Sequence, residues 1–411
     1  MHGIETVLTL LIASAVVSTL AHWVRFSYTL ALLLFGLVAG LAGVVEAPAL
    51  SSAAILLVFL PPLLFEASFV LNLRELWAVR LAVYLLALPG VLLAMVVGGA
   101  LVHWGAGLPW TIALLFGAIV AATDPVAVLA IFRELRVAPR LTALVEGESL
   151  LNDGVALVLL VTLVEAVDDG FEPAAAVVRF VAAVGGGVAI GVVVGWLGHV
   201  LISLIDDHLT EMVVSMAVAY GSFLAAEEVH VSGVLATIAA AMALGELGRR
   251  RGWIFSDGSE QTLVDLWEFL AFLANATLFL LMGLTIRDAG LLDHPSYALW
   301  GIGAALLGRA VVAYGIGPWL GQLGAPMSRP ERHVLFWAGL RGAVALAAAL
   351  SLPPAFPHRP QLLAMTYGAV IFTLLAQGLT IAPMMRRVGI EVASPPPPRP
   401  LRERARPRPV G

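Results

Sequence analysis

The sequence predicts an all-α membrane protein with thirteen transmembrane helices, two of them broken and crossing, arranged as an inverted repeat. Three observations lead to this prediction. The 411 residues are 60% hydrophobic and only 12% charged, a composition that suits a chain crossing lipid many times rather than a soluble domain. Apolar stretches of about 20 residues, the length that crosses a hydrocarbon core, recur along the chain. Two of these stretches contain motifs that interrupt a helix.

The apolar stretches define the candidate spans. The first twenty residues lack a basic segment, so we expect a spanning helix there and no cleaved signal peptide. The absence of cysteine excludes disulfides and thiolate catalysis. In chain order the spans are predicted at residues 4–21, 27–44, 51–69, 79–102, 110–132, 140–165, 174–204, 211–226, 229–247, 262–286, 296–320, 331–351 and 361–385.

The arginines in the loops predict the orientation. Alternate loops hold most of the loop arginines, together with the Arg-rich C-terminal end, whereas the opposite loops hold only Arg179, Arg287 and Arg359. By the positive-inside rule, the N-terminus is therefore outside and the C-terminus is cytoplasmic. The stretch from Ser394 is rich in Pro and Arg, and we expect it to be disordered.

The seventh stretch is rich in glycine. Gly187, Gly191 and Gly195 recur at four-residue spacing, which permits close contact with a neighbouring helix. Two interpretations stay open. Either this helix is simply packed tightly, or it links two halves of the protein that move.

Residues Glu148 to Asp153 fall in the sixth stretch. A helix that starts at Ser149 would span about 24 Å, too short for a core of about 30 Å, whereas one that starts after Pro139 would reach about 39 Å. The longer helix places Asp153 about 21 Å deep, near the midplane. Ser149 and Asp153 then share one face, as do Glu148 and Asn152. The alternative is a loop capped by these polar residues.

The fifth stretch contains the motif TDP at 123–125. Proline removes a backbone donor and disfavours the α conformation in the residue before it, so the helix is predicted to break at Asp124. A broken span exposes carbonyls that can coordinate a cation beside a side-chain oxygen. A proline kink without function is the alternative. Because carboxylates near the middle of a bilayer are costly and mark ion pathways, Asp124 and Asp153 predict a membrane ion transporter.

The twelfth stretch contains the motif GLRG at 339–342, seven spans after the first break. Two interrupted helices in corresponding positions predict an inverted repeat, in which spans one to six match spans eight to thirteen. We expect Arg341 to offset carbonyl ends where the broken helices cross. Arg309, inside span eleven, needs an acidic partner at depth, with Glu148 as the leading candidate; the alternative is that Arg309 snorkels to the interface.

Three further polar residues are candidates. Glu66, late in span three, either faces the ion cavity or sits near the cytoplasmic interface. Glu227 and His230, between spans eight and nine, belong either to the outer mouth of the pathway or to an exposed acidic loop.

These motifs together resemble a known family, the monovalent cation/proton antiporters of the bacterial NhaP and animal NHE type. The similar segments occur in the order of that family, and the resemblance covers essentially the whole membrane region. The long cytoplasmic regulatory region of animal relatives is absent, so we do not expect their regulation to carry over. The segments are ATDPVAV at 122–128, ESLLNDG at 148–154, AExxHxSG at 226–233 and GLRGAVA at 339–345.

The resemblance implies a homodimer in the lipid of a bacterial plasma (inner) membrane, with an interface domain and a mobile core transport domain. Interface helices 1–3 fall in residues 1–75, and linker helix 7 with interface helices 8–10 falls in 171–290. Core helices 4–6 fall in 76–170 and core helices 11–13 in 291–390. Residues 391–411 form a cytoplasmic tail. No nucleic-acid partner is expected.

The resemblance also implies the ion site. Asp153 binds the cation or the proton, and Glu148 pairs structurally with Arg309. Members with Asn before Asp, as in Asn152 and Asp153, are usually electroneutral. The other residues implied around the site are Asp124, Thr123 through its carbonyl, Ser149, Asn152 and, through water, Glu66.

Competition at one carboxylate predicts exchange. Asp153 can hold a proton or a desolvated cation but not both, and either occupant neutralises the core and lets it cross the hydrophobic barrier. We therefore expect protons entering the cell to drive sodium or lithium out, electroneutrally and in an elevator-like manner. We expect no enzymatic activity and no cofactor, only the transported ions.

Three alternatives stay open. Potassium/proton exchange fits the same oxygen ligands. An intramembrane serine hydrolase with Ser149 as nucleophile would need a deep His as base, whereas His199, His230 and His333 lie near predicted span ends. A passive cation channel is disfavoured, because two interrupted helices favour alternating access.

Overall fold

The chain folds into α-helices, two of which continue through π-helical turns. The computed structural model describes residues 28–42, 51–169, 173–205, 207–250, 259–286 and 294–390, with a few isolated positions besides, and this part contains no strand. The elements are α2 (Tyr28–Leu41), α3 (Ser52–Val70), α4 (Leu73–Ala87), α5 (Pro89–Ala106), α6 (Trp110–Ile119), α7 (Val126–Leu135), α8 (Pro139–Asp169), α9 (Pro173–Ile202), α10 (His208–Glu228), α11 (Gly233–Arg250), α12 (Ser259–Thr285), α13 (Pro295–Val311), η1 (Val312–Ile316), α14 (Gly317–Leu320), α15 (Arg329–Trp337), α16 (Ala343–Leu350), α17 (Arg359–Phe372), η2 (Thr373–Gln377) and α18 (Gly378–Val388).

Seven helical runs in the described part are long and apolar enough to cross a membrane. The longest is Leu73–Ala106, which combines α4 and α5. Four further apolar helices are shorter, including Trp110–Ile119 in α6. The prediction of an all-α protein with many membrane helices is confirmed. The count of thirteen spans stays a prediction, and the first predicted span at 4–21 and the tail at 391–411 lie outside the described residues.

The fourth predicted span differs from the structure. The hydropathy pattern predicted one helix over 79–102, but α4 already begins at Leu73, where the Asn72 side chain caps it by accepting from the Arg74 N–H at 3.1 Å. The charged first turn hides this start from a hydropathy window. A break at Leu88 separates α4 from α5, because Pro89 has no N–H to continue the helical hydrogen bonds.

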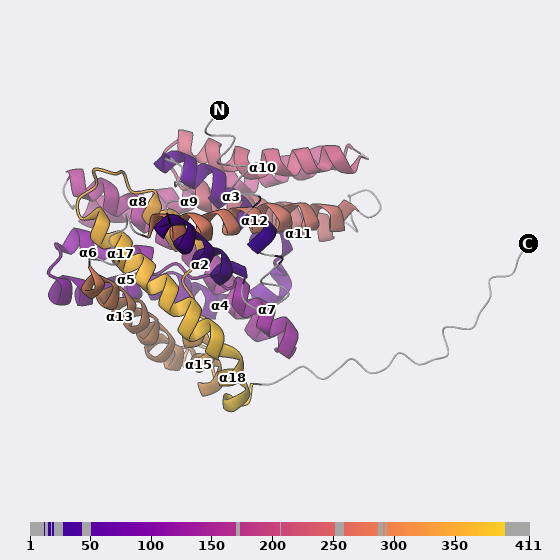
Figure 1. Cartoon of the computed structure of the whole chain (residues 1–411). Helices are drawn as coiled ribbons and strands as arrows, with labels where there is room; N and C mark the ends of the chain where they lie inside the picture. The colour runs from indigo at the N-terminus through magenta and orange to yellow at the C-terminus, as the bar shows by residue number, and fades with distance from the viewer. Residues whose placement is uncertain are drawn as a thin grey trace, which may run out of the picture.

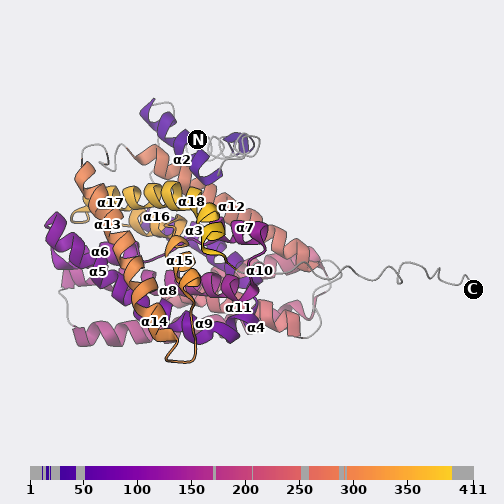
Figure 2. The same cartoon turned by 90° about the horizontal axis from the view of Figure 1, so that it is seen from below.

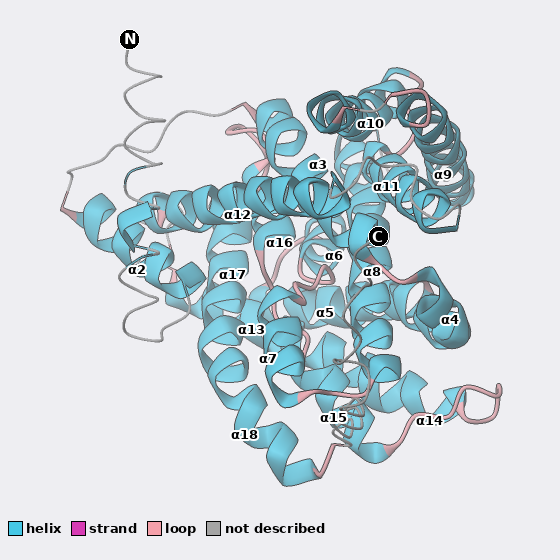
Figure 3. Ribbon diagram, turned by 90° about the vertical axis from the view of Figure 1, so that its right-hand side faces the viewer, coloured by secondary structure: helices cyan, strands magenta, loops and turns pink. Residues whose placement is uncertain are grey.

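The helices form two groups. In the first group α12 packs against α2 and α3, and α11 packs against α3, α9 and α10. In the second group α5 packs against α6 and α13, α4 against α8, and α13 against α17. Figure 1 shows α3, α10 and α12 above α13, α15 and α18. Figure 3 shows α9, α10 and α11 at one corner and α13, α17 and α18 toward the opposite side. The role of each group as an interface or transport domain stays a prediction.

The glycines of α9 bring it close to α11. A side chain at Gly195 would meet the Ala240 carbonyl oxygen at 2.5 Å and the Ala243 methyl at 3.0 Å. Gly187 and Gly191 contact α11 and the turn before it in the same way. Small residues at this spacing allow two helix backbones to approach. The predicted close contact is therefore confirmed, while a linking role between moving halves stays a prediction.

The two predicted helix breaks are present and touch each other. The first lies between α6 and α7, at residues 120–125, and the second lies between α15 and α16, at residues 338–342. The Asp124 N–H donates to the Leu340 carbonyl at 2.8 Å and so joins the breaks. Figure 2, seen from below, draws α15 and α16 toward the middle of the view. The crossing of these segments within a membrane stays a prediction.

Candidate cation site

Four polar side chains lie buried along the middle of α8. Glu148, Ser149, Asn152 and Asp153 are each no more than 6% exposed. Because an α-helix has about 3.6 residues per turn, Ser149 and Asp153 share one face, and Glu148 and Asn152 share the adjacent face. The helix continues without interruption from Pro139, so it is the longer of the two helices considered from the sequence.

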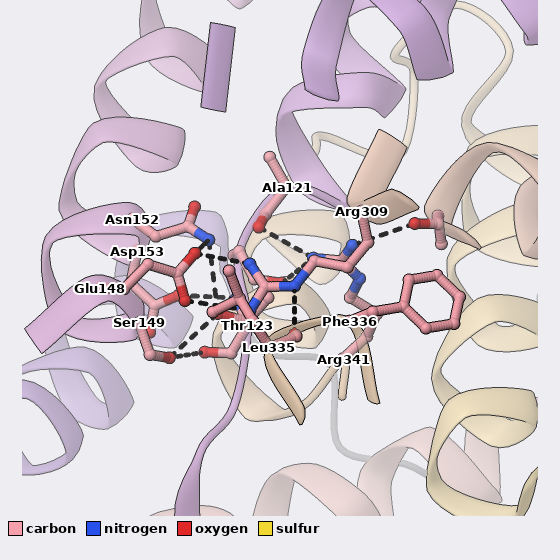
Figure 4. Close-up of polar contacts among 12 residues, drawn as sticks. Ala121, Thr123, Glu148, Ser149, Asn152, Asp153, Arg309, Leu335, Phe336 and Arg341 are labelled. Atoms are coloured by element: carbon pink, nitrogen blue, oxygen red, sulfur yellow. Dashed lines mark hydrogen bonds and ion pairs between the residues drawn. The ribbon is translucent and has the colours of Figure 1, made fainter. Parts of the chain in front are cut away.

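The face with Ser149 and Asp153 contacts the break between α6 and α7. The Thr123 N–H donates to Asp153 Oδ1 at 3.0 Å, and the Ser149 hydroxyl donates to the Thr123 carbonyl at 2.6 Å. The two hydroxyl oxygens of Thr123 and Ser149 also lie 3.0 Å apart. Because Thr123 lies outside a helix, its backbone groups have no helical partner and can make these bonds. Figure 4 shows Thr123 between the α8 side chains and two arginines.

Asp124 lies at the start of two short helices. Its Oδ1 accepts from the Val126 N–H of α7 at 3.0 Å, and the Ala343 N–H of α16 also donates to its carboxylate. Both helix N-termini carry partial positive charge, which stabilises a carboxylate. The Asp124 side chain is therefore held by backbone donors from both breaks.

A cavity of about 290 Å³ reaches these carboxylates from between the two helix groups. Asp124, Ser149 and Asp153 line it from the second group. Tyr28 of α2 and Glu66 of α3 line it from the first group. Glu66 thus lines the cavity, while its depth relative to the membrane interface stays a prediction.

Glu148 and Arg309 form a buried ion pair on the adjacent face of α8. Arg309 Nη1 donates to Glu148 Oε1 at 2.5 Å, and Nη2 donates to Oε2 at 3.0 Å. The two side chains are 1% and 4% exposed. Arg309 Nε also donates to the Leu335 carbonyl at 3.0 Å at the end of α15. Two parallel hydrogen bonds between charged groups make this a rigid bidentate contact. Snorkelling of Arg309 is therefore not what the structure shows.

Arg341 bridges the two breaks. Its Nη1 donates to the carbonyls of Ala121 and Ala122, at 2.8 and 3.0 Å, and Nη2 donates to the Ala305 carbonyl at 3.2 Å. Carbonyls beyond the end of α6 have no helical donor, and the guanidinium supplies donors and positive charge. The Arg341 N–H donates to Thr373 Oγ1 at 3.1 Å, which fixes the second break against η2.

Asn152 does not line the 290 Å³ cavity. Its Nδ2 donates to Thr123 Oγ1 at 3.3 Å and approaches Glu148 Oε1 at 3.5 Å. Its buried Oδ1 has no hydrogen-bond partner among the described residues. A place for Asn152 around the cation stays a prediction. The Asn152 amide holds the Thr123 side chain through this hydrogen bond. The face of α8 that Asn152 shares with Glu148 points toward the two arginines and away from the cavity.

Comparison with known proteins places this arrangement in a family. Residues 7–387 match the family model described as "Sodium/hydrogen exchanger, transmembrane". The chain belongs to this family. As a sodium/hydrogen exchanger family member it is a multi-pass membrane protein, and its fold agrees with a solved structure. The sodium proton antiporter MjNhaP1 from Methanocaldococcus jannaschii, at pH 8, aligns with a TM-score of 0.79 and 20% identity, over 95% of this chain and 100% of that one.

Curated relatives of this exchanger family member carry related names. The Na(+)/H(+) antiporter ApNhaP of Aphanothece halophytica is 39% identical over 398 residues, which cover 95% of this chain and 75% of that protein. The Na(+)/H(+) antiporter NhaH of Halobacillus aidingensis is 33% identical over 408 residues, covering 95% of this chain and 100% of that protein.

Two of the candidate residues in this exchanger lie away from the cavity. Glu227, in the last turn of α10, and His230, in the turn between α10 and α11, are both exposed. Glu227 Oε1 accepts from the Gly233 N–H at 3.2 Å, and His230 adopts a left-handed backbone with φ of 57°. The geometry accounts for Glu227 as a stabiliser of this turn. A role at an outer mouth stays a prediction.

Sequence reasoning missed four polar residues that line the cavity of this exchanger. Arg133 of α7, Glu146 of α8, and Glu268 and Asn275 of α12 all face it. The signal for Asn275 was present, because it is a lone amide in the apolar run 269–284. Arg133 lies near the end of α7, and Glu146 and Glu268 lie two to three turns inside α8 and α12, in no motif that singled them out.

The serine hydrolase alternative has no geometric support. The Ser149 hydroxyl donates to a backbone carbonyl and contacts the Thr123 hydroxyl. A nucleophilic serine needs a hydrogen bond to a general base, and none of the described histidines makes one with Ser149.

Proposed function

We propose that the protein exchanges sodium or lithium ions for protons across the plasma membrane, with Asp153 binding either the cation or the proton. The observation that carries this proposal is the convergence of Asp153 and Ser149, which line the cavity, on the Thr123 backbone, which hydrogen-bonds to both side chains. Its other support is the family membership of the chain and the names of its relatives.

The site has the ligands that a small cation prefers. Carboxylate, hydroxyl and carbonyl oxygens suit hard cations. Asp153 accepts one backbone hydrogen bond, which leaves its other oxygen available to an ion or a proton. Burial favours the neutral carboxyl and a bound cation favours the charged one, so the two occupants exclude each other. Asp124 is held by backbone donors from α7 and α16 and is proposed to stay charged as a fixed ligand.

Alternating access would come from movement of one helix group against the other. The residues proposed to bind the ion lie on α8 and in the break between α6 and α7, whose flanking helices α6 and α8 belong to the second group, while α2, α3 and α12 form the other wall of the cavity. Sliding of the second group would carry Asp153 from one side of the membrane to the other. We propose a homodimer held through the first group, an N-terminus outside and a cytoplasmic C-terminus.

Sodium is proposed over potassium because the relatives reported above are named for Na(+). Oxygen ligands alone do not fix ion size, so the choice rests on family membership.

The test of the function is proton movement in proteoliposomes that contain the purified protein. Addition of sodium should dissipate an imposed pH gradient, and Asp153→Asn should abolish this response while the protein stays folded. The matched control is Asp207→Asn, a neutralised carboxylate at the exposed start of α10, which should leave exchange intact. A mutant at Asp153 with the wild-type rate would remove this residue from its role.

Exchange is further proposed to be electroneutral. Asn152 cannot titrate, and Asp124 is held by fixed donors, so one cation should cross against one proton. A cycle that moves one net charge would gain or lose about 2.3 kcal/mol per 100 mV of membrane potential. Because one-for-one exchange moves no net charge, its rate should stay the same when potassium and valinomycin clamp the membrane potential at different values. A sodium-driven proton flux that changes several-fold with potential would contradict this stoichiometry.

A further inference from the structure

Asn275 occupies an unusual position in α12. Its side chain is 6% exposed and lines the 290 Å³ cavity from the first helix group. Within the described part of the chain, no hydrogen bond joins its amide to another residue. Its neighbour Thr277, by contrast, donates to the Leu273 carbonyl of its own helix at 2.8 Å. Asn275 is therefore a buried amide whose free polar atoms have only the cavity to face.

A buried amide is costly unless it finds a partner. Packing alone does not require Asn at this position, because Leu has the same number of side-chain heavy atoms in the same branched arrangement and carries no polar atoms to desolvate. The same cavity contains Asp124 and Asp153 on the opposite wall, together with the Ser149 hydroxyl. The occupants that such a cavity can offer an amide are water and the cation itself.

We propose that Asn275 is a further ligand of the transported cation, and that its amide oxygen binds the ion directly or through one water of its hydration shell. An amide oxygen is a neutral hard ligand that adds affinity without a second titrating group. This inference rests on the proposed function, and it adds a residue from the wall opposite Asp153.

The position of Asn275 has a consequence for transport. Asp153 lies on the second helix group and Asn275 lies on the first, so they can share an ion only while this cavity connects the two groups. The amide therefore helps to capture the ion on the side to which this cavity opens, and it is left behind when the second group moves.

The test is sodium binding to the full-length protein in detergent, measured as the rise of the melting temperature with sodium concentration. Asn275→Leu should need about fivefold more sodium than the wild type for the same rise in melting temperature, because it loses one contact worth about as much as a neutral hydrogen bond. Asn275→Ala should weaken sodium binding similarly, and it serves if the Leu variant does not fold. Asn275→Asp, which keeps an oxygen at this position, should bind sodium at least as tightly as the wild type.

Two reference variants separate the possible failures. Thr277→Val removes a polar group from the same helix outside the cavity, and it should need the same sodium concentration as the wild type for the same rise in melting temperature. Asp153→Asn should abolish the sodium response. If the wild type shows no sodium response, the proposed function fails. If the wild type and Asp153→Asn behave as expected but both Asn275→Leu and Asn275→Ala titrate like the wild type, the role of Asn275 alone is refuted.

Discussion

Neutralising either partner of the Glu148–Arg309 pair should destabilise the protein strongly. The guanidinium and the carboxylate share two hydrogen bonds of 2.5 and 3.0 Å and are almost completely buried. Removing one partner leaves the other charge buried without compensation, at a cost of about 3–5 kcal/mol. At about 2 °C per kcal/mol for a chain of this size, Glu148→Gln or Arg309→Gln should lower the melting temperature by about 6–10 °C.

The double variant distinguishes pairing from two independent contributions. Replacing both residues by Gln removes both charges, so the loss should be well below the sum of the single losses. The exposed pair Arg179–Glu165, at 3.3 Å, is the matched control, and each of its single neutral variants should change the melting temperature by less than about 2 °C. Scanning fluorimetry in one detergent measures all these variants. A double variant whose loss equals the sum of the single losses would refute the reasoning.

Three further predictions follow from other parts of the structure. Gly342→Ala should reduce exchange at least about tenfold, because the added methyl would overlap the Asp124 side chain, whereas Gly185→Ala, which meets open space, should exchange at the wild-type rate. A high-resolution density map should show one ordered water in the cavity of about 10 Å³ that Asn152 and Arg341 line. The reason is that Asn152 Oδ1 is a buried acceptor and Arg341 Nε a buried donor, and neither has a partner among the described residues. A map without density for a water at this place would contradict the prediction. The side-chain hydrogen bond from Thr210, together with the backbone hydrogen bond from the same residue, lowers the pKa of Asp207. The ionised carboxylate therefore stabilises the fold at neutral pH, and this stabilisation is lost as the pH falls through the pKa of Asp207 in the folded protein. The melting-temperature deficit of Asp207→Asn should therefore shrink on acidification, and a deficit that is constant with pH would show that charge is not its cause.

The helix breaks could be predicted from the sequence because they have local causes. Pro125 removes a backbone donor and disfavours the helical conformation at Asp124, and the glycines of the second break lack side chains that would favour a helix. The length of α8 followed from the thickness of a bilayer. A buried Arg309 needed an acidic partner at depth, and Glu148 was the leading candidate, which the family resemblance also implied. In each case one strong physical constraint left few alternatives.

The arrangement of side chains around the cavity could not be predicted in the same way. Helical spacing showed that Asn152 and Asp153 lie on different faces of α8, but it did not show which face meets the cavity. That depends on how the second helix group packs against the first. Asn275 could not be assigned to the site for the same reason, because its helix is distant in sequence from every residue that contacts Asp153. The start of α4 was missed because its first turn is charged.

The central claim is that one carboxylate binds either a proton or a cation. The most direct measurement is the number of protons that the purified protein releases for each sodium ion bound, obtained by calorimetry in buffers of different ionisation enthalpy across a pH series. The wild type should release up to one proton per sodium as the pH falls, and Asp153→Asn should release none. Sodium binding that releases no proton at any pH, or that releases two, would contradict the account.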